Sequence, residues 1–73
     1  MEPFILNNHS QPNGDFEVHR LNACEHLPLR QDWLFLGNFS NCQDALDSAR
    51  VQYPHIAERI DGCYYCCNNC HTR

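Results

Sequence analysis

The alternation of apolar and polar side chains predicts two short strands in the first half of the chain. Within residues 15–21, Phe16 and Val18 alternate with polar neighbours, which is the two-residue period of a strand with one buried face. Residues 33–36 form a second apolar run, rich in aromatic side chains and followed by Gly37, as expected for a strand that ends in a turn. The simplest arrangement pairs these two strands in antiparallel fashion.

Residues 40–53 have the period of an amphipathic helix. Ser40 followed by Gln43 fits a capping box at its start, and Pro54 ends it. The apolar positions recur at intervals of three and four residues and form one stripe, which consists of Cys42, Ala45, Leu46, Ala49 and Tyr53. We expect this stripe to pack on the sheet.

The N-terminal residues 1–14 are predicted to be a flexible tail. Residues 7–14 are turn formers and helix or strand breakers in succession, and the short apolar piece at residues 4–6 is expected to dock only loosely. Residues 15–73 then form a single small domain. A chain of 73 residues buries only about 60% of its extended surface, so its core alone gives little stability and a disulfide or metal staple is expected.

The cysteines near the C-terminus supply such a staple. Two C-x-x-C pairs lie end to end over residues 63–70, and the two-residue spacer lets both thiolates of a pair reach one tetrahedral Zn²⁺ at about 2.3 Å. A helix of seven residues would span about 10.5 Å, too far for all four thiolates to share an ion, so Cys24 is the natural distant ligand. The predicted zinc ligands are Cys24, Cys63, Cys66 and Cys70, with His71 as the alternate fourth ligand.

The remaining cysteines and histidines have other interpretations. Cys42 lies in the apolar stripe of the predicted helix and is expected to pack in the core, as buried free cysteines do. Cys67 adjoins Cys66, and two adjacent side chains do not easily point to one site, so Cys67 is expected to be a spare thiol. His19 and His26 lie near Cys24 and are candidate ligands, although a lone histidine is more often a surface or hydrogen-bonded side chain.

Charge and composition limit the classes of partner. The net charge is −4, and the five basic residues are all arginines scattered among nine carboxylates, whereas nucleic-acid binders gather basic residues on one face. A nucleic-acid partner is therefore disfavoured, and a protein partner of unknown identity is expected.

The N-terminus has no secretory signal pattern, and no stretch approaches the roughly 20 apolar residues of a membrane span. We expect a cytoplasmic protein without a membrane partner, in a compartment where cysteine clusters hold metals.

The chain resembles two groups of proteins. The residues that carry a likeness to the Ada-type metal-binding domain are Val18-His19-Arg20, Cys24, Phe39-Ser40, Asp44-Ala45-Leu46, Ala49 and the C-x-x-C at residues 63–66. The likeness covers about residues 16–66 and implies that Cys24, Cys63 and Cys66 are zinc ligands, while Pro28 stands where that family has its second upstream cysteine. The ending D-G-C-x-x-C…C-H is also similar to that of small uncharacterised bacterial Cys-rich proteins, which implies no activity.

Together these features predict an α+β fold in which a small antiparallel β-sheet packs on one amphipathic helix, with a C-terminal Cys-rich, ribbon-like zinc knuckle. The Ada-type domain transfers a methyl group from a DNA phosphotriester to a zinc-bound thiolate. We do not carry this activity over, because the ligand set differs and no basic surface is evident.

Three functions are compatible with the cysteine pattern. The first is a zinc-binding structural or protein-interaction module without catalytic residues. The second is a thiol–disulfide redox protein that uses a C-x-x-C pair. The third is c-type haem attachment, since Cys67, Cys70 and His71 match C-x-x-C-H. An enzyme is disfavoured because cysteine-rich zinc sites are usually closed, whereas a catalytic zinc keeps an open position.

Overall fold

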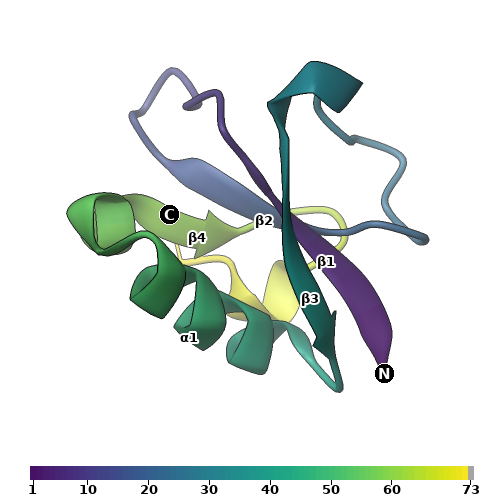
Figure 1. Ribbon diagram of the computed structural model, residues 1–73. Coiled ribbons are helices and arrows are strands. Elements are labelled where there is room, and N and C mark those ends of the chain that lie inside the picture. The colour runs from purple at the N-terminus through teal and green to yellow at the C-terminus, as the bar shows by residue number, and fades with distance from the viewer. Residues whose placement is uncertain (73) are drawn as a thin grey trace.

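The computed structural model, which describes residues 1–72, contains a four-stranded mixed sheet and one long helix. The elements are β1 (Glu2–Asn7), β2 (Phe16–Arg20), β3 (Trp33–Phe39), α1 (Cys42–Gln52) and β4 (Ile60–Gly62). The strand order is β3-β1-β2-β4, and α1 runs across one face of the sheet (Figure 1). The predicted α+β class is confirmed. The sheet is mixed because β4 pairs parallel to β2, whereas the other pairs are antiparallel.

The N-terminal segment is a central strand of the sheet. β1 pairs with β2 on one side and β3 on the other, and Phe4, Ile5 and Leu6 are each at most 1% exposed. The prediction of a flexible tail over residues 1–14 is therefore wrong for residues 2–7. Three consecutive apolar residues are the pattern of a strand buried on both faces. The turn-forming residues that follow them were given more weight in the sequence analysis, and so this strand was missed.

The two strands predicted from the sequence do not pair with each other, because β1 lies between β2 and β3. β3 also continues beyond the predicted end at Gly37. The register against β1 shifts between Phe4 and Ile5, which is a β-bulge, and Gly37 has φ +129° there, a backbone angle that favours glycine. The glycine therefore bends the strand without ending it.

The helix is the element that the sequence predicted best. Of its apolar stripe, Cys42, Ala45, Leu46 and Ala49 are buried in the core. Its N-cap differs from the predicted capping box, because the side chain of Asn41, and not that of Ser40, accepts a hydrogen bond from the backbone N–H of Asp44 at 2.8 Å. The remaining helices are the short 3-10 turns η1 (Arg30–Asp32), η2 (Pro54–Arg59) and η3 (Asn68–Cys70).

The two faces of the sheet have different surroundings. Phe4, Leu6 and Val18 belong to the core under α1, while Ile5 and His19, paired across β1 and β2, point to the opposite face because side chains alternate along a strand. Both are at most 2% exposed.

Among the described residues 1–72, no helix has the length and apolar character needed to cross a bilayer.

Candidate metal centre

Four potential metal ligands meet at the face of the sheet opposite α1. They are His19, Cys24, Cys63 and Cys66, and their candidate ligand atoms all lie within 4.8 Å of one another. His19 and Cys63 are buried, whereas Cys24 and Cys66 are partly exposed. A group of one imidazole and three thiols within this distance could hold a single metal ion.

The first two residues of this group come from β2 and the turn that follows it. His19 is the penultimate residue of β2 and faces away from α1. After the strand, the backbone N–H of Cys24 donates to the carbonyl of Arg20 at 3.1 Å. This turn reverses the chain, so Cys24 returns to the side of the strand where His19 lies, and its Sγ is 3.5 Å from Nδ1 of His19.

The other two residues come from the C-terminal segment. The backbone N–H of Cys63 donates to the carbonyl of Val18 at 2.9 Å, which extends the pairing of β2 and β4 by one residue and sets Cys63 beside His19. A tight turn follows, in which the N–H of Cys67 donates to the carbonyl of Cys63 at 2.9 Å. This turn brings Cys66 back toward the start of the knuckle, where its Sγ accepts a hydrogen bond from the backbone N–H of Arg20 at 3.2 Å.

The spacing between ligand atoms agrees with that of a tetrahedral zinc site. Zn–S bonds of about 2.3 Å and Zn–N bonds of about 2.0–2.1 Å, at tetrahedral angles, give S···N separations of about 3.6 Å and S···S separations of about 3.8 Å. The distance from Cys24 Sγ to His19 Nδ1 is 3.5 Å, and that from Cys24 Sγ to Cys63 Sγ is 3.9 Å. These two separations match those of ligands that share one zinc ion, and the other ligand atoms of the group lie within 4.8 Å of one another.

Backbone N–H groups point at the sulfurs. Besides the bond from Arg20 to Cys66, the N–H of His26 donates to Cys24 Sγ at 3.3 Å, and the backbone of Cys66 and Tyr65 hydrogen-bonds to the Cys63 thiol. Such donors stabilise negative charge on sulfur. Each of the three thiols is therefore prepared to carry the charge of a metal-bound thiolate.

Burial shifts the pKa values of the group toward neutral side chains. It lowers the pKa of His19 to about 4, with a further contribution from the nearby His26, so the imidazole is neutral and free to bind a metal. Burial also raises the pKa of Cys24 and raises that of Cys63 to about 12. Without an ion these thiols stay protonated at neutral pH, because a buried thiolate lacks a compensating charge.

Cys66 and Cys67 affect each other although they face different surroundings. Their sulfurs are 3.9 Å apart, and the hydrogen bond between the two thiols raises the pKa of Cys66, to which burial adds, and lowers that of Cys67. Cys67 is fully buried in the core with the helix residues, and it is a free thiol outside the four-residue group. This agrees with its interpretation as a spare thiol.

The group is accessible from one side. A shallow pocket of about 200 Å³ lies beside it, and its lining residues are Ala23, Cys24, Glu25, His26, Tyr65 and Cys66. The rings of His26 and Tyr65 are stacked with centroids 3.8 Å apart. The two partly exposed cysteines line this pocket, so it offers a path by which an ion or a chelator reaches the site.

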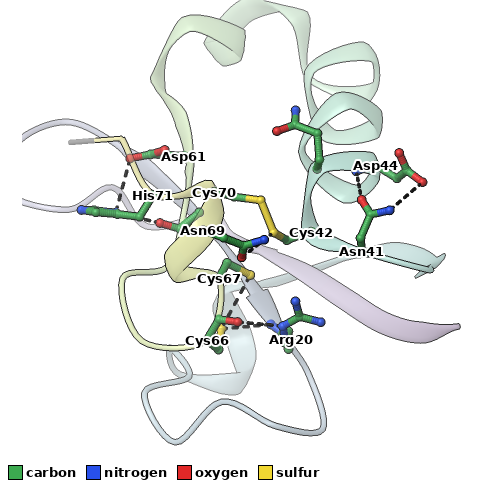
Figure 2. Close-up of a disulfide and its surroundings, with 12 residues drawn as sticks. Arg20, Asn41, Cys42, Asp44, Asp61, Cys66, Cys67, Asn69, Cys70 and His71 are labelled. Atoms are coloured by element: carbon green, nitrogen blue, oxygen red, sulfur yellow. Dashed lines mark hydrogen bonds and ion pairs between the residues drawn. A yellow bond between two sulfur atoms is a disulfide. The ribbon is translucent and has the colours of Figure 1, made fainter.

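Cys70, a predicted ligand, lies elsewhere. It forms a disulfide with Cys42, the first residue of α1, and Figure 2 shows this bond between η3 and the start of the helix. A sulfur held in a disulfide is not a thiolate and cannot act as the predicted ligand. Cys42 is buried, as its place in the apolar stripe indicated, but it is bonded and not free.

His71, the predicted alternate ligand, is also outside the group. Its Nδ1 is 2.9 Å from the carbonyl oxygen of Gly62 and 3.4 Å from a carboxylate oxygen of Asp61 (Figure 2). The same carboxylate accepts hydrogen bonds from Thr72. These contacts hold His71 and Thr72 against β4. The C-x-x-C-H pattern at residues 67–71 also lacks two accessible thiols, because Cys70 is in a disulfide and Cys67 is buried.

His19 takes the place that the sequence analysis assigned to Cys70 or His71. The alternation along residues 15–21 put His19 on the side opposite Val18, which suggested a solvent-facing residue. That face is instead covered by the turn that carries Cys24 and by the knuckle at residues 63–66. His19 was a candidate ligand in the sequence analysis because it lies near Cys24, but Cys70 and His71 were preferred as the fourth ligand.

The chain matches no protein-family model, and neither a curated protein nor a solved structure is similar enough to it to assign a family. The resemblance to the Ada-type domain and to small bacterial Cys-rich proteins therefore stays a prediction, and the metal centre rests on its own geometry.

Proposed function

We propose that this protein is a small zinc-binding module in which one structural Zn²⁺ joins β2 and its following turn to the C-terminal knuckle. The ligands are His19, Cys24, Cys63 and Cys66. The observation that carries the proposal is that the four ligand atoms lie within 4.8 Å of one another, and that one S···N and one S···S distance among them match those of a tetrahedral zinc site.

The ligand types favour zinc and a structural role. Thiolates and an imidazole form the Cys₃His set found in structural zinc sites, whereas hard cations such as Mg²⁺ and Ca²⁺ prefer oxygen ligands. Four protein ligands complete the tetrahedral shell and leave no position for a substrate. The ion therefore acts as a staple, and a protein remains the expected class of partner, because the five arginines are scattered among nine carboxylates along the sequence.

The redox alternative has less support. The oxidised pair joins Cys42 to Cys70 and is not one of the C-x-x-C pairs. The hydrogen bond with Cys66 lowers the pKa of Cys67, but the Cys67 side chain is fully buried, and a substrate disulfide has no access to it. Reactive cysteines are usually at least partly exposed.

Metal stoichiometry in matched variants tests the proposal. Native mass spectrometry of protein purified with zinc is expected to show one ion per chain, and Co²⁺ in its place is expected to give the absorption bands of a tetrahedral thiolate site. The informative pair is Cys66→Ala and Cys67→Ala, which remove neighbouring sulfurs. Cys66→Ala is expected to lose the ion and Cys67→Ala to keep it. A wild-type protein without metal, or equal loss in both variants, would contradict the proposal.

A further inference from the structure

The two nitrogens of His19 have different surroundings. Nδ1 lies 3.5 Å from Cys24 Sγ and so faces the side of the ring on which that sulfur lies. Nε2 is on the far side of the ring, buried and without a hydrogen-bond partner within residues 1–72. The group beside it is the carboxylate of Glu17, with Oε1 at 3.8 Å. An N–H···O bond has an ordinary length of about 2.9 Å, so a shift of about 0.9 Å closes this gap.

The strand itself creates this juxtaposition. Glu17 and His19 are two residues apart on β2, so their side chains stand next to each other on the same face of the sheet. The Glu17 side chain is only 20% exposed and that of His19 only 2%, so neither group is well hydrated. A buried polar nitrogen without a partner is costly, and the nearby carboxylate is an acceptor suited to a donating Nε2–H.

We propose that the metal binds His19 through Nδ1, and that Glu17 accepts a hydrogen bond from Nε2–H and thereby fixes the imidazole in the metal-binding tautomer. Glu17 is then a positioning residue and not a ligand. This inference rests on the proposed zinc function and adds a carboxylate–histidine–zinc arrangement to it. Histidines that bind metals commonly donate their other ring N–H to a carboxylate, which orients the ring and increases its basicity.

Coordination through Nε2 would require a different arrangement. The ion would then lie on the Glu17 side of the ring, away from Cys24 Sγ, and the measured S···N distance would have no role. Nδ1 would also be left beside Cys24 Sγ without the metal. The separation of 3.5 Å between Nδ1 and sulfur, close to the roughly 3.6 Å expected for two ligands of one zinc ion, therefore favours Nδ1.

Cadmium NMR of the wild-type protein tests the ligand atom without any substitution. In protein labelled with ¹⁵N and loaded with ¹¹³Cd²⁺, we expect scalar coupling between the metal and His19 Nδ1, and a slowly exchanging proton on Nε2. Coupling to Nε2 would overturn the inference while the metal-binding function stands. Absence of any bound Cd²⁺ or Zn²⁺ in the wild type would overturn both.

Substitutions test the part played by Glu17. Glu17→Val keeps a side chain suited to a strand and removes the acceptor, so zinc affinity is expected to fall about 10- to 100-fold and Nε2–H exchange to become faster. Glu17→Gln keeps an acceptor oxygen and is expected to restore most of the affinity. Asp47→Asn, at an exposed position of α1, matches the charge change of Glu17→Gln and is expected to have no effect. Equal affinity and equal Nε2–H exchange in Glu17→Val and the control would overturn the role of Glu17.

Discussion

The raised pKa values of the three thiols make metal binding at the proposed site a proton-releasing reaction. Burial raises the pKa of Cys24 and raises that of Cys63 to about 12, and the pKa of Cys66 is raised by its hydrogen bond to Cys67 and by burial. All three are therefore protonated in the metal-free protein at neutral pH. His19, with its pKa lowered to about 4, holds no proton above about pH 5 and has none to release.

These pKa shifts predict the pH dependence of zinc affinity. Each thiol that binds the ion must lose its proton, so between pH 5.5 and 8 the logarithm of the apparent association constant is expected to rise by about three per pH unit. Competition titrations against a chelator of known pH behaviour measure this slope. A histidine with an ordinary pKa of about 6.5 would steepen the slope toward four below that pH, and such steepening would contradict the neutral state of His19.

Gly62 shows how closely the knuckle packs on β4. A Cβ atom added there would lie 2.9 Å from the carbonyl oxygen of Cys67 and 3.0 Å from Cβ of Cys70. Since one of these atoms belongs to the backbone, it cannot move aside easily. Gly62→Ala is expected to reduce the free energy of unfolding by about 1–3 kcal/mol, whereas Val51→Ala, at an exposed helix position, should change it by about 0.5 kcal/mol or less. Urea denaturation of zinc-loaded protein measures both, and equal stability would contradict the close contact.

At the scale of the element, the start of α1 distinguishes two candidate caps. Asn41 accepts the hydrogen bond from Asp44 N–H, while Ser40 makes no such bond in the described structure. Asn41→Ala is expected to destabilise the protein by about 1 kcal/mol, and Ser40→Ala to change its stability by about 0.5 kcal/mol or less. Thermal unfolding under the same metal loading compares the two. A larger effect at Ser40 would restore the capping box predicted from the sequence.

The helix and two of the strands could be predicted because their signals are local. The apolar stripe of α1 and the alternation in β2 depend only on neighbouring residues, and both are present where the pattern placed them. β1 was missed because its role depends on long-range pairing, in which it fills the space between β2 and β3. The resulting order also explains why the antiparallel pairing of residues 15–21 with 33–36 was wrong.

Three of the four residues of the candidate site were predicted from the sequence, and the fourth was not among the preferred ligands. Cys24, Cys63 and Cys66 were chosen from spacing, and the structure brings these three together. The choice of His19 as the fourth member depended on which face of β2 the following turn and the distant knuckle cover, and the position of His19 near Cys24 did not decide that by itself. The disulfide joins Cys42 to Cys70, which lie 28 positions apart in the sequence. It was not predicted, because disulfide connectivity cannot be deduced from cysteine spacing alone.

At the scale of the whole molecule, the segment at residues 63–70 is linked to the rest of the fold at two places. The candidate metal centre ties residues 63–66 to β2 and its turn, and the disulfide ties η3 to the start of α1. The cytoplasmic location expected from the sequence stays a prediction. The disulfide between Cys42 and Cys70 argues against that location, because such bonds persist mainly in oxidising compartments.

Removing the two staples separately and together tests how the fold depends on them. A disulfide that closes a loop of this length contributes about 3.6 kcal/mol in the chain-entropy model, and the whole domain is expected to have only about 4–11 kcal/mol of stability. Chelation alone is therefore expected to leave β1 protected from hydrogen exchange, while protection is lost at residues 21–26 and 63–66. Reduction alone should lower protection at η3 and the first turn of α1.

Loss of both staples is expected to unfold the protein, because the core beneath α1 is small and a domain of this size needs such links. Circular dichroism and hydrogen exchange on native, chelated, reduced and doubly treated samples measure the four states. Restoring Zn²⁺ to the doubly treated protein should recover the sheet, since binding to the folded state alone shifts the equilibrium toward it. If the doubly treated protein keeps its native exchange pattern, the apolar core holds the fold by itself. The ion would then serve a purpose other than stability.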